Sequence, residues 1–478
     1  MAPLPRVRNY IDGHWAEPES TFEPLNPVDQ TPIAIVQNSN LDDVDQAVCA
    51  ARRALSGWKS LNPTIRARYL HDVARVVAKH ESSLARSITL EMGKTLVEAT
   101  GEVQKLSKAF DFYAEEATRI HGETIPNDVD GYLSIVAYEP IGVIAAITPW
   151  NYPLELIGWK MCAALAAGCT IVVKPSEFSS LSAGGLFACL NEVGLPAGVV
   201  NLVLGRRDAG PLLVAHRGVD KIAFTGSTET GTRIAQSIPS AMPLSMELGG
   251  SCPMIVSGQA DVDRAVKGAA RRGFRNAGQI CIAINRIYVE ENVYEEFVEK
   301  LTTNVRSLKT GNGLDPTSDI GPMATPEGLA KVEMHIADAR ERGAVITTGG
   351  SRIAALNPGN YFEPTVVTEC TPEMLIMHDE TFGPAVGVMP YRSLDDAISW
   401  ANGTTAGLAA YFFTKDLAET FDVGSRLDFG NVAVNNVDAG IMNAPYGGRK
   451  GSGYGYEHGR EGLRGYLQLK HLRISHGE

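Results

Sequence analysis

The chain has 478 residues, which at roughly 150 residues per domain is enough for about three domains. Hydrophobic residues make up 44% of the chain and charged residues 21%, a balance that excludes collagen-like and disordered classes. The formal net charge of −12 disfavours a nucleic-acid or anionic-membrane partner, because both of these surfaces are negatively charged.

The sequence contains no pattern typical of a membrane span, a secretion signal or a metal site. The uncharged stretch Met161–Val173 is shorter than the roughly 18 residues that cross a bilayer. Residues Met1–Trp15 contain no apolar run of the kind a signal peptide needs. The seven cysteines form no Cys-x-x-Cys pair, and the ten histidines show no metal-ligand spacing. We therefore expect a cytoplasmic protein with free cysteines and no metal.

The first part of the chain is predicted to be helical from Leu41 to about His121. Apolar residues recur at spacings of three and four, as in an amphipathic helix, with Asn40 and Thr64 placed as N-caps. The period then changes to two over Tyr132–Glu139, which predicts an edge or hairpin strand.

Short β-rich runs alternate with helical patterns after residue 140. The runs are Ile141–Ile147, Thr170–Lys174, Val199–Val203, Lys221–Thr225 and Leu244–Leu248. This alternation predicts a mainly parallel, doubly wound α/β sheet, since parallel neighbours need crossover helices. The alternation resumes after Gly250, which predicts a second α/β lobe, and the chain ends in a β-like run from Tyr466.

Polar and glycine-rich strings follow several of these predicted strands, where open α/β sheets bind their ligands. The strings, with two further ones downstream, are Thr148-Pro149-Trp150-Asn151-Tyr152-Pro153, Lys174-Pro175-Ser176-Glu177, Phe224-Thr225-Gly226-Ser227, Met246-Glu247-Leu248-Gly249-Gly250, Gly278-Gln279-Ile280-Cys281 and Glu380-Thr381-Phe382-Gly383-Pro384. In this order and spacing, and with Glu457 beyond them, they closely resemble the NAD(P)-dependent aldehyde dehydrogenase family over nearly the whole chain.

The resemblance implies three parts. These are a Rossmann-type cofactor domain from residues 1–121 and 142–248, a second α/β catalytic domain from 249–444, and a small β oligomerisation element from 122–141 and 445–478. It also implies a homodimer or a homotetramer. A glycine-rich string at 451–455 follows no clear strand and opens no helix, so we predict a flexible connection there.

Cys281 is the candidate nucleophile. It follows a helix in a Gly-x-x-Cys turn, where a thiol can attack an aldehyde carbon, give a thiohemiacetal and then, after hydride loss, a thioester. Without the surrounding motifs, the better interpretation of Cys281 would be a small buried hydrophobic residue. The resemblance favours the nucleophile.

The other candidate catalytic residues are Asn151, Glu247 and Glu457. The Asn151 amide, with the backbone N–H of Cys281, would stabilise the oxyanion, although asparagine in a proline-rich turn is also a common turn former. Glu247 is the one carboxylate in an apolar run and would activate water to hydrolyse the thioester, unless it is merely tied to nearby backbone. Coenzyme A-acylating relatives generally lack this glutamate, so hydrolysis is favoured. Glu457 matches a family glutamate implicated in proton relay.

For the cofactor, Gly226 and Ser227 open a helix whose N-terminal amides can hold a pyrophosphate. The resemblance implies further contacts from Thr148, Pro149, Trp150, Lys174, Ser176, Glu177, Leu248, Glu380 and Phe382. A carboxylate at Glu177 would accept hydrogen bonds from ribose hydroxyls and repel a 2′-phosphate, which favours NAD while leaving NADP possible. Without the resemblance, these residues would pass for turn, cap or core positions.

The candidate substrate-binding residues are Arg275, Tyr152, Trp159 and Ile282. Arg275 occupies a position similar to an arginine that binds the substrate carboxylate in succinate-semialdehyde dehydrogenases, or it forms an ion pair on its own helix. Trp159 stands where that subfamily has a second arginine. Ile282 follows Cys281 at a point where those enzymes often have a second cysteine. We therefore expect a small anionic aldehyde, with a lactaldehyde or sulfolactaldehyde as alternatives. A non-catalytic member of the fold would be expected to lose Cys281 or Glu247.

Overall fold

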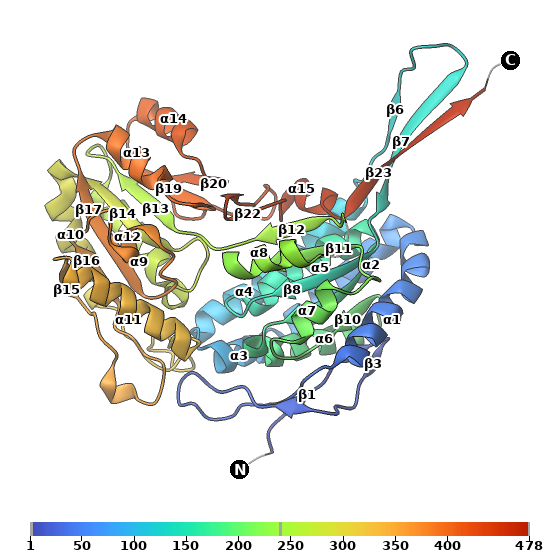
Figure 1. Cartoon of the computed structure of the whole chain (residues 1–478), viewed down its shortest axis with the longest axis horizontal. Coiled ribbons are helices and arrows are strands. Elements are labelled where there is room, and N and C mark those ends of the chain that lie inside the picture. Colours follow the sequence, from blue (N-terminus) through green and yellow to red (C-terminus); the bar gives the residue numbers. More distant parts are fainter. Residues whose placement is uncertain (1–2, 239–240, 477–478) are drawn as a thin grey trace.

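The computed structural model describes residues 3–238 and 241–476, which form two large sheets and a projecting arm (Figure 1). The larger sheet has the strand order β22-β12-β11-β8-β9-β10-β2-β3. Its strands are β22 (Gly453–Tyr454), β12 (Leu244–Glu247), β11 (Lys221–Thr225), β8 (Val143–Thr148), β9 (Thr170–Pro175), β10 (Val200–Leu202), β2 (Tyr10–Ile11) and β3 (His14–Trp15). The five strands from β12 to β10 are parallel, as the sequence predicts.

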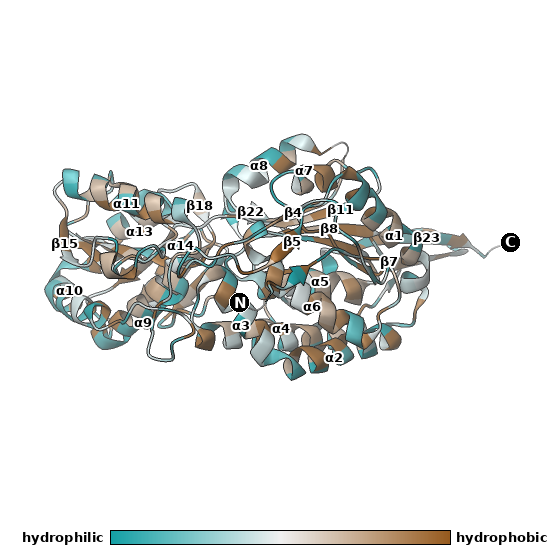
Figure 2. Cartoon of the chain, turned by 90° about the horizontal axis from the view of Figure 1, so that it is seen from below, coloured by the Kyte–Doolittle hydropathy of each residue, from teal (hydrophilic) through white to brown (hydrophobic). Residues whose placement is uncertain are grey.

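Helices cover both faces of this sheet, because its central strands are buried on both sides (Figure 2). One face packs against α1 (Leu41–Ser60), α7 (Ala209–Val214) and α8 (Thr228–Ser237). The other face packs against α2 (Pro63–Lys79), α3 (Glu81–Met92), α4 (Leu96–Ala117), α5 (Pro153–Ala167) and α6 (Ser180–Val193). The predicted helical region therefore forms α1 to α4.

The second sheet has the order β15-β16-β17-β14-β13-β19-β20 and is parallel except for β15. Its strands are β15 (Val345–Thr348), β16 (Thr365–Thr368), β17 (Ala385–Tyr391), β14 (Ile284–Glu290), β13 (Cys252–Val256), β19 (Ala409–Phe413) and β20 (Asn431–Val434). Its helices are α9 (Val262–Phe274), α10 (Glu291–Arg306), α11 (Pro326–Glu341), α12 (Leu375–His378), α13 (Leu394–Asn402) and α14 (Leu417–Arg426). The chain passes from β12 into β13 through Gly249 and Gly250.

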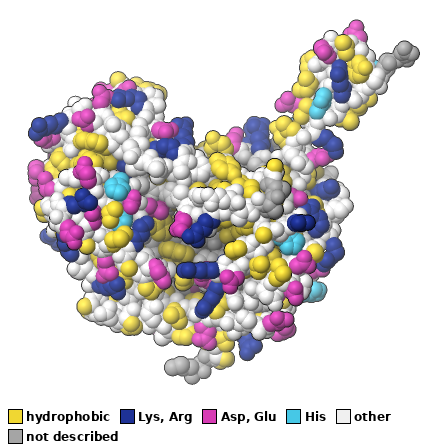
Figure 3. Space-filling view, viewed as in Figure 1, with side chains coloured by type: hydrophobic (Ala, Val, Ile, Leu, Met, Phe, Trp, Pro, Cys, Tyr) yellow, Lys and Arg dark blue, Asp and Glu magenta, His cyan; other side chains and the backbone are white. Residues whose placement is uncertain are grey.

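The arm is a three-stranded antiparallel sheet that projects from the larger lobe. It consists of β6 (Glu123–Ile125), β7 (Tyr132–Pro140) and β23 (Leu467–Ser475). Strand β23 pairs with β7 along its full length, from Leu467 against Pro140 to Ser475 against Tyr132. Hydrophobic side chains lie exposed among charged ones along this arm (Figure 3).

Two short sheets complete the fold. At the N-terminal edge lie β1 (Arg6–Val7), β5 (Ile35–Gln37) and β4 (Thr21–Phe22), and beside the second lobe β18 (Ala406–Gly407) pairs with β21 (Arg449–Lys450). The described residues also contain three 3-10 turns: η1 (Glu177–Ser179) directly before α6, η2 (Arg275–Gly278) directly after α9, and η3 (Ala354–Leu356) in a loop. No helix in residues 3–238 or 241–476 is long and apolar enough to cross a membrane.

The structure differs from the sequence-based expectations near the C-terminus. Residues 451–455 are not a flexible connection, because β22 pairs with β12 and the Ser452 hydroxyl donates to the carbonyl of Gly249 at 2.7 Å. The following helix, α15 (Gly459–Arg464), packs on α5. Residues 445–466 therefore lie on the two lobes, and only the segment from Leu467 joins the arm.

One of the two predicted N-caps is also misplaced. Asn40 caps α1 as predicted, since its side chain accepts from the Asp43 N–H at 3.0 Å in a capping box. The cap of α2 is Asn62 and not Thr64, because Pro63 occupies the first helical position and the Asn62 side chain accepts from the Thr64 N–H.

Candidate active site

The carboxyl ends of β8, β11 and β12 meet the Cys281 turn around a cavity of about 250 Å³. The predicted residues that line it are Pro149, Trp150, Asn151, Gly226, Ser227, Leu248, Cys281, Glu380 and Phe382. Residues from both sheets thus face one space, at the strand ends where open α/β sheets bind ligands.

Cys281 is presented by a turn with an unusual backbone. Asn276 and Ala277 have positive φ values of 53° and 52°, followed by Gly278 at 72°. A Cβ atom at Gly278 would lie 2.0 Å from the carbonyl oxygen of Gly383, so glycine is required there. The Cys281 sulfur, in a partly exposed residue, lies 3.5 Å from the Tyr446 hydroxyl.

Burial, with a smaller contribution from the carboxylates of Glu380 and Glu247, raises the pKa of the Cys281 thiol to about 12, while the Tyr446 hydroxyl opposes the rise. In this structure the sulfur is therefore protonated at neutral pH. Attack on a carbonyl requires the proton to leave the thiol.

The link between the two sheets packs directly against the backbone of Cys281. A Cβ atom at Gly250 would lie 2.1 Å from the carbonyl oxygen of Cys281. The Cys252 thiol donates to the same carbonyl at 3.4 Å, and the Gly250 N–H donates to Glu380 Oε1 at 2.9 Å. The path from β12 to β13 thus sets the position of the Cys281 backbone.

Asn151 lies beside Cys281 in the cavity and is buried. One N–H of its side-chain amide donates to the carbonyl of Gln279 at 3.1 Å. Because an amide carries two N–H donors, the second can serve an oxygen bound in the cavity. The asparagine is more than a turn former, since its side chain reaches the turn of the nucleophile.

Glu247, Lys160 and Glu457 form a buried group behind the cavity. Lys160 Nζ lies 2.5 Å from Glu457 Oε1 and 2.5 Å from the Thr225 hydroxyl. Glu247 Oε2 has no hydrogen-bond partner among the described residues, so this oxygen is not tied to neighbouring backbone. Burial raises the pKa of Glu247 well above its usual range, the Glu457 carboxylate adds to the rise, and Lys160 opposes it. Glu457 is buried, although its sequence context is that of a surface residue.

The residues predicted to hold a cofactor fall into two groups. Trp150 and Phe382 both line the cavity and pack edge-on with ring centroids 5.7 Å apart, and Ser227 caps α8, whose first residues are exposed. The cavity, its aromatic walls and this helix start suit a nicotinamide ribose leading to a pyrophosphate. Glu177 instead lines a neighbouring hollow together with Arg206 and Arg207.

Three further predicted cofactor residues do not line the main cavity. Thr148 is buried at the end of β8, and its hydroxyl has no partner among the described groups. Lys174 is the last residue but one of β9, and burial lowers its pKa while Glu177 opposes that shift. Ser176 caps the turn η1, accepting from the Phe178 N–H at 3.3 Å.

Aromatic rings lie on the other side of Cys281. Trp159 packs edge-on against His458 at 4.1 Å and against Tyr446 at 5.5 Å. Burial lowers the pKa of His458 to about 4, so the ring is neutral. Ile282 follows the nucleophile and is half-buried, and its carbonyl accepts from the Tyr411 hydroxyl at 2.7 Å.

Arg275 does not take part in the ion pairs formed from the adjoining helix. Arg271 and Arg272 both pair with Asp438, whereas no ion pair involving Arg275 occurs within residues 3–238 and 241–476. Burial raises the pKa of Tyr152, and the Arg275 guanidinium opposes that rise, so the two side chains lie near each other. The half-buried guanidinium does not line the cavity at Cys281 and lies near the carboxylates of Glu98 and Glu155.

Sequence reasoning missed Tyr446, His458 and Lys331. Tyr446 contacts the nucleophile from 165 positions away, and its motif Pro-Tyr-Gly-Gly was the available signal. Lys331 lies on α11 and lines the cavity with Glu380, where its charge lowers the pKa of that carboxyl against the effect of burial. A lysine in an amphipathic helix carries no sequence signal for such a position.

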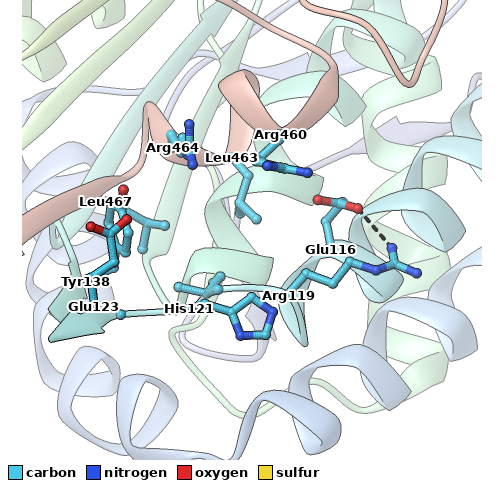
Figure 4. Close-up of a pocket in the computed structure, with 11 residues that line it drawn as sticks. Glu116, Arg119, His121, Glu123, Tyr138, Arg460, Leu463, Arg464 and Leu467 are labelled. Atoms are coloured by element: carbon cyan, nitrogen blue, oxygen red, sulfur yellow. Dashed lines mark hydrogen bonds and ion pairs between the residues drawn. The ribbon is translucent and has the colours of Figure 1, made fainter.

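A second cavity, of about 240 Å³, lies where the arm meets the larger lobe (Figure 4). Its charged lining consists of Glu116 on α4, Arg119 just after that helix, Glu123 on β6, and Arg460 and Arg464 on α15. Glu116 pairs with Arg119 at 2.8 Å. None of the predicted site residues line this cavity, and it contains no cysteine. The cavity at Cys281 is therefore the better candidate active site.

Comparison with known proteins agrees with this architecture. The sequence matches the aldehyde dehydrogenase family over residues 15–472. It is 42% identical to the 3-sulfolactaldehyde dehydrogenase of Pseudomonas putida, covering 98% of this chain and 97% of that protein. It is 41% identical to the NADP(+) succinate-semialdehyde dehydrogenase of Escherichia coli K12, covering 98% of each.

Solved structures give the same result. Betaine aldehyde dehydrogenase from Staphylococcus aureus in complex with NAD+ superposes with a TM-score of 0.96 and 37% identity, over 99% of this chain and 95% of that one. These matches place the chain among the oxidoreductases that act on aldehydes. The chain belongs to the aldehyde dehydrogenase family.

Proposed function

We propose that this protein oxidises a small anionic aldehyde to its carboxylate with NAD(P)+, in a hydrolytic and not an acylating reaction. The observation that carries the proposal is the shared cavity: the Cys281 thiol faces the strand-end residues suited to a dinucleotide, with the buried carboxyl of Glu247 close by. The named activities of the relatives, oxidation of succinate semialdehyde and of sulfolactaldehyde, support the same reaction class.

In the proposed mechanism the sulfur of Cys281 bonds to the aldehyde carbon as the thiol proton passes to a base. The carbonyl oxygen becomes an oxyanion, held by the free N–H of the Asn151 amide and by the backbone N–H of Cys281. Hydride loss from the thiohemiacetal would leave a thioester on Cys281, and a bound NAD(P)+ would supply the hydride acceptor. Trp150, Phe382 and Glu380 would hold its nicotinamide riboside.

Glu247 would then take a proton from the water that attacks the thioester, which releases the acid and restores the thiol. A carboxyl with a raised pKa is a stronger base than an ordinary one, and this suits the step. Glu457 and Lys160 lie next to Glu247 and would pass the proton onward. The cofactor assignment is NAD(P), with Glu177 favouring NAD on the ribose side.

Arg275 would bind the anionic end of the substrate, while Tyr152, Trp159 and Ile282 shape the space around it. A guanidinium accommodates a carboxylate or a sulfonate, so the second candidate is a sulfolactaldehyde-type substrate, favoured by the relative in Pseudomonas putida. We also propose a cytoplasmic homodimer or homotetramer, supported by the free cysteines and by the exposed apolar residues of the arm.

The substrate proposal is tested by Arg275→Met. Loss of one charge-assisted interaction should raise KM for anionic semialdehydes about 10- to 100-fold and leave neutral aldehydes unchanged. Steady-state kinetics with both aldehyde types and both dinucleotides measures this. Arg271→Met, which removes an exposed arginine paired with Asp438, is the matched control. An equal loss on both aldehyde types would remove Arg275 from substrate recognition.

A further inference from the structure

The two turns that carry Asn151 and Cys281 are both held from behind by one segment, Lys94 and the first turns of α4. The chain enters this segment through Gly93, which has a φ of 88°. Lys94 and Glu98 bond to the two turns, and Glu102 bonds to Lys94 and to the start of α5. None of the three lines the cavity of the candidate active site.

Lys94 is a fully buried lysine, and its partners lie on the Asn151 turn. Its Nζ lies 2.6 Å from Glu102 Oε2, and neither side chain is exposed to solvent. The same Nζ donates to the backbone carbonyl of Asn151 at 2.9 Å and lies 3.7 Å from the centre of the Tyr152 ring. The ammonium group thus joins α4 to the backbone of the residue whose side-chain amide is the proposed oxyanion donor.

The second oxygen of Glu102 holds the start of α5. Glu102 Oε1 accepts from the N–H of Leu154 at 2.8 Å and from the N–H of Glu155 at 3.2 Å. Since helix starts leave such N–H groups without partners, a carboxylate there is stabilised by the bonds and by the helix dipole. One carboxylate therefore fixes the helix that follows Asn151 and orients Lys94.

Glu98 completes the connection to the nucleophile. Its Oε1 accepts from the N–H of Asn276 at 2.8 Å, in the turn that leads to Cys281. Asn276 Nδ2 in turn donates to the carbonyl of Asn151 at 3.0 Å. The Asn151 carbonyl thus accepts two hydrogen bonds, one from Lys94, which precedes α4, and one from Asn276 in the turn that leads to Cys281. These bonds fix the position of one turn relative to the other.

We infer that Lys94 and Glu102 are positioning residues of the reaction, which set the Asn151 amide against the carbonyl carbon attacked by Cys281. The inference rests on the proposed role of Asn151 and deepens it. Misplacing a reacting group by about 1 Å can cost roughly 10²-fold in rate, and losing an oxyanion donor costs about 10²- to 10³-fold. A buried pair so close to the donor acts on kcat without touching the substrate.

The test uses the full-length enzyme with Lys94→Met and Glu102→Gln. Each should lower kcat by about 10²-fold. The dissociation constant for the dinucleotide and the alkylation rate of Cys281 should stay within about twofold, because neither the cofactor cavity nor the sulfur contacts the pair. The stoichiometry of dinucleotide binding gives the fraction of folded sites, so that a lower kcat is not confused with unfolding. Glu102→Gln keeps a hydrogen-bond acceptor for the start of α5, so it decides the question if Lys94→Met does not fold.

Glu91→Gln is the matched control. Glu91 is equally buried and accepts from the N–H groups of Leu181 and Ser182 at the start of α6, as Glu102 does at the start of α5, but it bonds to neither active-site turn. Glu91→Gln should lower the melting temperature and leave kcat within about twofold of the value for the parent enzyme. The inference would be overturned if Lys94→Met and Glu102→Gln fold and also keep kcat within about twofold of the parent enzyme.

A double-mutant cycle with Asn151→Ala separates this inference from the proposed function. If Lys94 acts through Asn151, Lys94→Met or Glu102→Gln should lower kcat less than about threefold in the Asn151→Ala background. Full additivity would contradict the positioning role while leaving Asn151 as the oxyanion donor. An active Asn151→Ala enzyme would instead refute the oxyanion role itself.

Discussion

Cys281 is the residue whose chemistry depends most on its surroundings. Its thiol is enclosed by the cavity walls, carboxyls of Glu380 and Glu247 lie near it, and one hydroxyl, that of Tyr446, reaches its sulfur. These groups hold the pKa of the thiol at about 12, above its ordinary value. In the free protein the Cys281 thiol is therefore protonated at neutral pH.

This pKa predicts the pH dependence of alkylation. Below a pKa of about 12 the thiolate fraction rises tenfold per pH unit, so the rate with iodoacetamide should rise about tenfold per unit from pH 7 to pH 9 in the cofactor-free protein. Mass spectrometry of the peptide that contains Cys281 measures it, with Cys281→Ser as the blank. A plateau below pH 8 would contradict the account.

At the residue scale, the sequence predicts a functional residue best where burial of that residue type would cost free energy without a functional reason. A lone carboxylate such as Glu247 in an apolar run, or an asparagine between prolines, stands out in the printed chain. Glu457 does not, because its burial against Lys160 depends on two segments 297 positions apart. The burial of Lys94 cannot be predicted from the sequence either, since only the fold shows that its ammonium group is buried.

At the scale of elements, the parallel strands could be predicted because each is short, apolar and bounded by turn residues. Helix ends were harder: Asn62 and not Thr64 caps α2, since a proline at the first helical position moves the cap one residue upstream of it. The prediction of a flexible connection at 451–455 is wrong because β22 is only two residues long and is stabilised by pairing with β12. So short a strand has no periodicity to detect.

The link between β12 and β13 makes a sharper prediction at this scale. Gly250→Ala places a Cβ against the Cys281 carbonyl, so the turn of the nucleophile must shift and kcat should fall by about 10²-fold. Stopped-flow measurement of NAD(P)H formation tests this. Gly57→Ala in α1, where nothing lies within 4 Å, is the control and should stabilise the protein by about 0.5–1 kcal/mol. Unchanged kcat in a folded Gly250→Ala enzyme would show that this contact does not position Cys281.

At the scale of the whole molecule, the active site is assembled from distant parts of the chain. Tyr446 and His458 reach Cys281 and Trp159 from the last forty residues, after the chain has left the second sheet and returned to the first. The order of motifs predicts the family, but not which side chains converge. That convergence depends on how the two lobes pack, which a linear pattern does not encode.

The arm gives the prediction for assembly. Leu472 on β23 is 53% exposed and lies opposite Ile135 on β7, with Leu133 beside it, so this face has an apolar strip that a second copy would cover. Leu472→Glu should shift the oligomer to a smaller species, as measured by light scattering during size-exclusion chromatography. His471→Glu, on the opposite face of the strand, should not. An unchanged mass for Leu472→Glu would place the interface elsewhere.

The most direct test of the central claim, that Cys281 forms a thioester which Glu247 helps to hydrolyse, is a rapid-quench experiment on Glu247→Gln. With aldehyde and NAD(P)+, the account predicts a burst of one NAD(P)H per active site, negligible turnover afterwards, and an acyl adduct on the peptide that contains Cys281. Steady turnover without a burst, or an adduct on another cysteine, would contradict it.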